Sequence, residues 1–101
     1  MIMMTVNKQL QGDKLTVAVE GRLDTTTAPE LEAQLKDSID AVTELVFDFS
    51  KLEYISSAGL RVLLTAQKCM NTQGSMIVRG CSDDIMEIFG ITGFSEILTI
   101  E

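Results

Sequence analysis

The apolar residues of this chain change their spacing repeatedly along the sequence, and this change limits the fold more than any other feature. In Lys14–Glu20, apolar side chains occupy every second position, as in a half-buried strand. In the next segment they recur three and four residues apart, at Ala28, Leu31, Leu35, Ile39 and Val42, as along one face of a helix. Strands that alternate with helices of about 10–14 residues predict an α/β fold built on a mostly parallel sheet.

The same reading along the whole chain predicts the order β-β-α-β-α-β-α and a short tail. Strands are expected at Met3–Gln11, Lys14–Glu20, Glu44–Phe49, Ser75–Arg79 and, at the end, Leu98–Ile100. Helices are expected at Ala28–Ala41, Ala58–Met70 and Ser82–Gly90, with one more turn at Gly93–Ile97. The opening hairpin makes this sheet of four or five strands mixed, with helices packed against it. A single domain over residues 1–101 is expected, because single domains cluster at roughly 100–150 residues.

Residues at the helix ends predict how each helix starts and stops. Thr27 followed by Glu30 matches a capping box, and Pro29 falls in the first turn, where its missing N–H costs little. Gly74 suits a left-handed exit, Ser82 suits an N-cap, and Gly90 is expected to end the third helix.

The composition excludes several classes of function. Eight Lys and Arg against 15 Asp and Glu leave a net charge of −7, which argues against binding nucleic acid or an anionic membrane surface. Without histidine, neither a Ser-His-Asp triad nor a Cys-His pair can form, so enzymatic activity is not expected. Cys69 and Cys81 are too few for a zinc site and are expected to be reduced thiols, with a disulfide between them as the alternative. No apolar run can span a bilayer, so a cytoplasmic protein is expected.

Cofactor and metal motifs are absent, and one pair of carboxylates has two interpretations. The chain contains neither Gly-rich phosphate-binding pattern nor a recognisable calcium loop, so no cofactor and no metal are expected. Asp24 and Asp48 are both expected at strand ends, where they can approach each other as an acid/base pair or simply cap turns.

The most informative segment runs from Asp48 to Leu64. A buried strand is expected to end at Asp48, a polar loop follows, and Ser56 and Ser57 stand at the start of a helix. Free backbone N–H groups and the helix dipole favour negative charge at such a position. The serines are therefore either ordinary N-caps or a place where the fold tolerates a phosphate.

Two motifs in this sequence resemble those of a known family. The first comprises Asp48-Phe-Ser50, Leu52 and Tyr54-Ile-Ser-Ser-Ala-Gly-Leu60, and the second is Gly21-Arg-Leu-Asp24 followed by Ala28 and Leu31. Together with the order of elements, they resemble STAS-domain proteins over nearly the whole chain. More narrowly, they resemble the bacterial anti-sigma factor antagonists.

This resemblance implies a phosphorylation switch. The unphosphorylated protein would bind an anti-sigma factor, a serine kinase of the GHKL ATPase type, and so release a sigma factor. The kinase would then phosphorylate Ser57, which precedes Ala58-Gly59-Leu60, and a PP2C-type phosphatase would reset the switch. Asp24 corresponds to the family's aspartate on the neighbouring loop. Many relatives have aspartate at position 56, so Ser56 is a competing acceptor in this sequence. Many relatives also continue into a further helix after position 101, so an apolar patch available for self-association is expected near the end of this sequence.

A phosphate on Ser57 can switch binding only if it lies inside the contact surface. The residues expected to bind the partner are Asp24, Ser56, Ser57, Ala58, Gly59 and Arg61. Arg61 follows Ser57 by four residues on the same helical face, where it can pair with the phosphate, pair with a partner carboxylate, or remain solvated. Leu60, Leu63 and Leu64 fit the apolar stripe and are expected in the core.

Two alternative functions remain. A non-phosphorylated STAS module can act as an adaptor in a transporter or stress-sensing complex, or respond to a nucleotide, because a fold does not determine a function. A serine hydrolase using Ser57 is the third alternative, but it lacks a histidine base.

Overall fold

The computed structural model describes residues 4–101, so the predicted start of the first strand at Met3 lies outside the described residues. The elements are β1 (Met4–Gln11), β2 (Lys14–Leu23), α1 (Ala28–Ser38), β3 (Glu44–Ile55), α2 (Ser57–Gln73), β4 (Ser75–Arg79), α3 (Asp83–Thr92) and α4 (Phe94–Ile97). This order is the predicted one.

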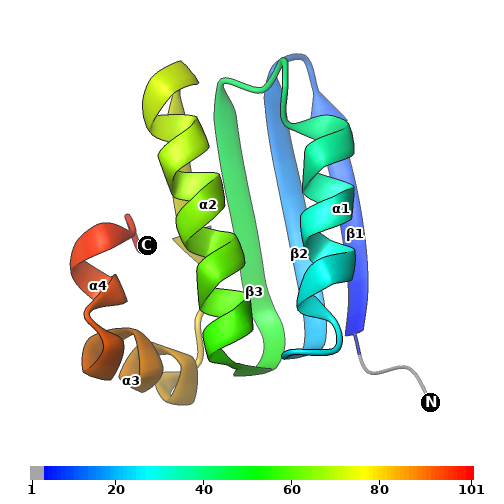
Figure 1. The fold of residues 1–101 in the computed structure, drawn as a ribbon. Coiled ribbons are helices and arrows are strands. Elements are labelled where there is room, and N and C mark those ends of the chain that lie inside the picture. The colour runs from blue at the N-terminus through cyan, green and yellow to red at the C-terminus, as the bar shows by residue number, and fades with distance from the viewer. Residues whose placement is uncertain (1–3) are drawn as a thin grey trace.

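The four strands form one sheet in the order β1-β2-β3-β4 (Figure 1). β1 and β2 are an antiparallel hairpin, whereas β2 with β3 and β3 with β4 are parallel. The predicted mixed, mostly parallel α/β sheet is therefore confirmed. The expected strand at Leu98–Ile100 is reduced to a single parallel bridge between Val78 and Ile100.

The core lies between the sheet and helices α1 and α2, which cover the same face of the sheet (Figure 1). Alternate side chains of β2 and the predicted stripe of α1 point into it, and Phe47, Leu63 and Met70 are fully buried there. The prediction that Leu60 and Leu63 belong to the core is confirmed. Leu64, by contrast, is only half-buried and is not part of the core cluster, so that prediction was wrong for this residue.

Strand β3 is six residues longer than its predicted range of Glu44–Phe49. The predicted polar loop after Asp48 is wrong, because this segment continues to pair with β2 up to Ile55. Two register shifts along this pairing, between Ala18 and Glu20 and between Gly21 and Arg22, change the side-chain alternation. Helix α3 contacts β3, and the extension of β3 has no pairing partner in the shorter β4.

The helix ends differ from several predictions. Thr27 is the N-cap of α1 but makes no side-chain capping bond, so the predicted capping box is not formed. Helix α1 ends at Ser38 rather than Ala41, and α3 continues past Gly90 to Thr92, where Gly93 with φ 82° ends it in the left-handed region.

Gly74 ends α2 for a different reason from the predicted one. Its backbone is extended, with φ 172°, and not left-handed. A Cβ at this position would overlap the carbonyl oxygen of Thr43, so glycine is required by the close approach of the two chain segments.

Candidate functional site

The carboxyl ends of β2 and β3 bring the two sequence motifs together. Leu23 and Ile55 are paired neighbours at the ends of their strands, and the Ser56 N–H donates to the Leu23 carbonyl oxygen at 2.9 Å. The loop that begins at Asp24 and the start of α2 therefore lie at the same edge of the sheet. Open α/β sheets commonly bind ligands at this edge.

The two serines at the start of α2 occupy different environments. Ser56 is the N-cap, and its half-buried side chain accepts a hydrogen bond from the Gly59 N–H at 3.5 Å. Ser57 is the first residue of the helix and is exposed. Within the described part of the chain, its hydroxyl has no hydrogen-bond partner. The structure thus gives Ser56 a capping role and leaves the Ser57 hydroxyl free.

The amino end of α2 carries an unbalanced positive potential. The helix has 17 residues, and its first turn contains no carboxylate, whereas Asp83 and Asp84 stand in the first turn of α3. The Leu60 N–H donates to the Ser56 carbonyl and the Gly59 N–H to the Ser56 side chain. The N–H groups of Ser57 and Ala58 are left at the positive end of the helix dipole, where an anion is stabilised.

The predicted partner-binding residues Ala58 and Gly59 have different positions. Gly59 is buried, and a Cβ there would lie 2.8 Å from side-chain carbons of both Leu23 and Ile55 and 3.0 Å from the Leu23 carbonyl oxygen. Gly59 therefore lets the first turn of α2 pack tightly on the strand ends. Ala58 is half-buried and faces α1.

Asp24 organises the loop between β2 and α1. Its carboxylate oxygen Oδ1 accepts hydrogen bonds from the backbone N–H groups of Thr26 at 3.0 Å and Thr27 at 3.2 Å. Partial burial opposes ionisation of this carboxyl, but the bonds from Thr27 and Thr26, together with the Arg22 guanidinium, outweigh it and lower its pKa. Asp24 is consequently a carboxylate fixed in one orientation.

Thr27 is a part of this site that the sequence analysis missed. Its hydroxyl donates to the Arg22 carbonyl oxygen at 2.8 Å and accepts from the Asp24 N–H at 2.9 Å. These bonds use the oxygen that the capping box would have required. The Asp-Thr-Thr-Thr run after a strand is a signal for such a loop, because Asp and Thr side chains commonly bond to nearby backbone groups.

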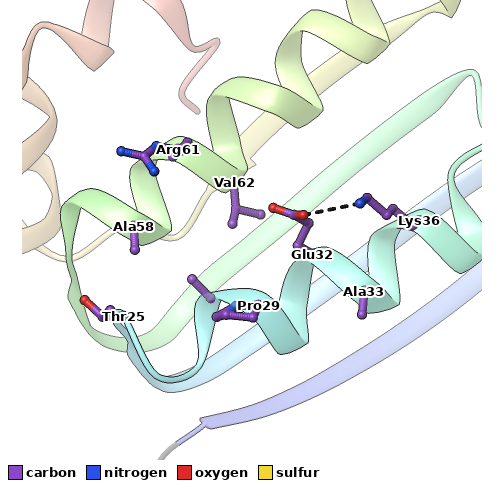
Figure 2. A pocket seen from close by; sticks show the side chains of 9 residues that line it. Thr25, Pro29, Glu32, Ala33, Lys36, Ala58, Arg61 and Val62 are labelled. Carbon is purple, nitrogen blue, oxygen red and sulfur yellow. Dashed lines mark ion pairs between the residues drawn. The ribbon is translucent and has the colours of Figure 1, made fainter.

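A groove of about 410 Å³ lies between α1 and the first turns of α2 (Figure 2). Its lining comprises Thr25, Ala28, Pro29, Glu32, Ala33, Lys36, Ala58, Arg61 and Val62. Glu32 and Lys36 form an ion pair at 3.4 Å along α1. In Figure 2 the Glu32 carboxylate points toward Val62 of α2. The exposed Arg61 makes no ion pair within residues 4–101, so its charge is available at the rim of the groove.

The structure separates Asp48 from Asp24, so the predicted approach of the two carboxylates is wrong. Asp48 lies within β3, seven residues before Ile55, which corresponds to roughly 23 Å along a strand. Backbone and side-chain hydrogen bonds from Ser50 lower the pKa of Asp48, and Arg79 lies 3.9 Å away. This carboxylate orients Ser50 and belongs to the sheet rather than to the site at its edge.

Residues 4–101 contain no group of three or more side chains that could hold a metal ion. No helix in this range is long and apolar enough to cross a membrane.

The sequence of this chain is similar to a known domain family and to several known proteins. The model of the STAS domain matches residues 4–101. A candidate anti-sigma factor antagonist of Bordetella bronchiseptica, BtrV, is 35% identical over 88 residues, covering 85% of this chain and 76% of BtrV. The anti-sigma-B factor antagonist of Listeria monocytogenes is 32% identical over 98 residues, covering 93% and 84% of the two chains.

Solved structures share the fold. An anti-sigma factor antagonist from Mycobacterium paratuberculosis superposes with a TM-score of 0.87 at 23% identity, over 96% of this chain and 84% of that one. SpoIIAA of Bacillus in its unphosphorylated form superposes with a TM-score of 0.83 at 18% identity, over 96% and 88%. SpoIIAA has also been solved in its phosphorylated form.

Proposed function

Because this chain belongs to the STAS domain family, we propose that it is an anti-sigma factor antagonist controlled by phosphorylation of Ser57. In the unphosphorylated state it binds an anti-sigma factor serine kinase of the GHKL type and so releases a sigma factor. Phosphorylation by that kinase ends the interaction, and a PP2C-type phosphatase restores it. The protein itself acts as a cytoplasmic regulator and not as an enzyme.

The observation that carries this proposal is the exposed and unbonded hydroxyl of Ser57 at the positive end of α2. A kinase must reach the hydroxyl, and the fold must then tolerate a group with a charge of about −1.5 to −2. Ser57 meets both requirements. Ser56 meets them less well, because it is half-buried and its oxygen caps the helix through the Gly59 N–H. We therefore assign the phosphate to Ser57 in preference to Ser56.

The energetics require the partner to cover Ser57. Moving a partner from 99:1 bound to 1:99 takes about 5.5 kcal/mol of differential affinity. Repulsion between two unit charges at 4 Å supplies about 4 kcal/mol near a protein surface and about 1 kcal/mol in water. A phosphate of charge about −1.5 to −2 multiplies these values by its charge, so the repulsion reaches the required size only when a partner charge lies within about 4 Å and away from bulk water. The partner must therefore cover and desolvate Ser57.

The neighbouring residues supply the rest of this contact surface. The carboxylate of Asp24 is held rigidly beside the start of α2 by Thr26 and Thr27. Arg61 offers an exposed cation one helical turn after Ser57, and it forms no ion pair among residues 4–101, so it can bind a carboxylate of the partner. Gly59 is buried beneath this surface and lets the first turn of α2 pack tightly on the strand ends.

Mass spectrometry and binding measurements with two substitutions test this function. The protein is incubated with ATP and the GHKL-type anti-sigma factor encoded in the same genome, and fragmentation locates any phosphate. Ser57→Asp should abolish binding to that factor, and Ser57→Ala should bind it and resist phosphorylation. Ser75→Asp is the matched control, because Ser75 is an exposed serine at the start of β4, at the other end of the sheet.

Each result has a distinct meaning. Phosphate on Ser56 would retain the mechanism but contradict the assigned acceptor. No phosphate with a kinase that is active on another substrate, or equal binding by the Asp and Ala variants, would contradict the switch. Such a result would favour the non-phosphorylated adaptor instead.

A further inference from the structure

A second hollow borders the first turns of α2. It lies on the side of α2 where α3 and α4 are placed, and α1 lies on the other side (Figure 1). This hollow measures about 310 Å³ and is open to solvent. We name it the α2–α4 hollow, and its lining consists of Ser57, Leu60, Arg61, Leu64, Thr92 and Phe94. Arg61 lines both this hollow and the groove toward α1, whereas Ser57 lines the hollow and not the groove.

The α2–α4 hollow is apolar, and one of its polar groups is already used. Leu60, Leu64 and Phe94 are the apolar residues of its lining. The Thr92 hydroxyl turns back into its own helix and donates to the Ile88 carbonyl oxygen at 2.7 Å. Leu64 is half-buried without belonging to the core, so its side chain is available to another molecule. The free polar groups are Ser57 and Arg61, both on the rim shared with the partner surface.

We propose that the α2–α4 hollow receives an apolar side chain of the anti-sigma factor, next to Ser57. This inference rests on the proposed function and names the part of the surface that provides its apolar contact. A stable interface buries about 800 Å² per partner, which is about one seventh of the 5658 Å² surface of this protein. A contact of that size centred on Ser57 extends beyond the Asp24 loop, and the hollow is continuous with Ser57 itself. A second copy of this chain fits less well, because each copy carries a net charge of −7.

The same geometry supplies the desolvation that the switch needs. A phosphate on Ser57 would stand at the rim of the hollow with its hydration shell. An apolar side chain could then enter only by stripping water from that phosphate, which is costly because a buried charge without a partner is strongly disfavoured. The modification therefore closes the hollow to an apolar guest without a change in fold.

Shortening Leu64 tests this inference. Leu64→Ala should raise the Kd for the anti-sigma factor at least tenfold, because truncating an anchor at the centre of an interface has effects of this size. Leu64→Met should bind within about threefold of the unmodified protein, since it keeps the apolar volume. Leu10→Ala is the matched control, because Leu10 is 60% exposed and lies on β1 opposite Leu15, at the far end of the sheet from Ser57.

Thermal unfolding followed by circular dichroism verifies that each variant is folded. If Leu64→Ala does not fold, Phe94→Leu trims the opposite wall and is expected to weaken binding in the same direction. If Leu64→Ala binds like Leu10→Ala while Ser57→Asp abolishes binding, the hollow is not the apolar contact and the proposed function stands. If the unmodified protein does not bind the anti-sigma factor, both proposals fail.

Discussion

The absence of a Cβ at Gly59 controls how closely α2 approaches the sheet. In Gly59→Ala the new Cβ would lie 2.8 Å from carbons of Leu23 and Ile55, so the helix must shift or the two side chains must move. We expect a loss of about 1–3 kcal/mol in the free energy of unfolding, as for other overpacked sites. Urea denaturation measures this loss.

Gly90→Ala is the matched control for that substitution. Gly90 lies inside α3, and a Cβ there would meet nothing within 4 Å. Alanine is favoured over glycine in a helix interior, so this variant should gain roughly 0.5–1 kcal/mol. Equal effects of the two substitutions would contradict the packing role of Gly59.

The ionised form of Asp24 stabilises the fold, and this contribution depends on pH. Hydrogen bonds from Thr27 and Thr26 lower the pKa of Asp24 in the folded protein below its ordinary value of 3.8, despite its partial burial. The stabilisation is therefore present above pH 3.8 and is lost as the pH falls through the lower folded pKa. The difference in urea midpoint between unmodified protein and Asp24→Asn should be largest near pH 7 and should shrink below pH 3.8. Parallel pH profiles would contradict this role.

At the scale of elements, Gln73 joins the ends of the two helices that cover the sheet. Its Nε2 atom donates to the carbonyl oxygens of Ile39 and Val42, both at 2.7 Å. These bonds fix the chain immediately after α1, where the apolar stripe predicts three more helical residues. Gln73→Met keeps the volume but leaves two carbonyls without a donor, so the free energy of unfolding should fall by about 1–2 kcal/mol. Gln11→Met, at the exposed end of β1, should change it much less.

The element boundaries show which features the sequence predicts and which it does not. The order of the elements and the pairing type of the four strands were predicted correctly. The apolar stripes were also predicted correctly, except at Leu64 and after Ser38, where α1 ends. The extension of β3 is not local, because Leu52 and Ile55 are buried at a spacing that fits a strand only after the register shifts against β2. The role of Gly74 likewise depends on Thr43, which is distant in the sequence. Thr27 differs, because its hydroxyl bonds to the Arg22 carbonyl five residues earlier, a local bond that the capping-box pattern does not include.

The meeting of the two motifs at one edge of the sheet was predicted more accurately than the element boundaries, since the motifs flank adjacent strand ends. The position of Ser57 at the start of α2 follows from the serine pair and the apolar stripe after it. The different environments of Ser56 and Ser57 do not follow from the sequence, because they depend on the hydrogen bond from the Gly59 N–H to the Ser56 side chain. The α2–α4 hollow also could not be predicted, since it needs the α3–α4 turn to fold back beside α2.

For the whole molecule, the switch should change the surface and leave the fold intact. The first turn of α2 contains no carboxylate, so an anion there should stabilise the helix by about 0.3–1 kcal/mol. For a domain of this size, 1 kcal/mol corresponds to about 4–8 °C in Tm. Ser57→Asp should therefore unfold at the same temperature as the unmodified protein or a few degrees higher, and Ser57→Lys should unfold a few degrees lower.

The Tm of Ser57→Asp, compared with that of the unmodified protein, decides how a loss of binding by this variant is interpreted. A variant that loses the anti-sigma factor while keeping its Tm has lost a surface contact, as a local switch requires. If Ser57→Asp instead lowered Tm by ten degrees or more, the negative charge would be disrupting the packing of Gly59 against the strand ends. Loss of binding would then report unfolding of the partner surface rather than obstruction of it. Differential scanning calorimetry of the Asp and Lys variants beside the phosphorylated protein separates the two mechanisms.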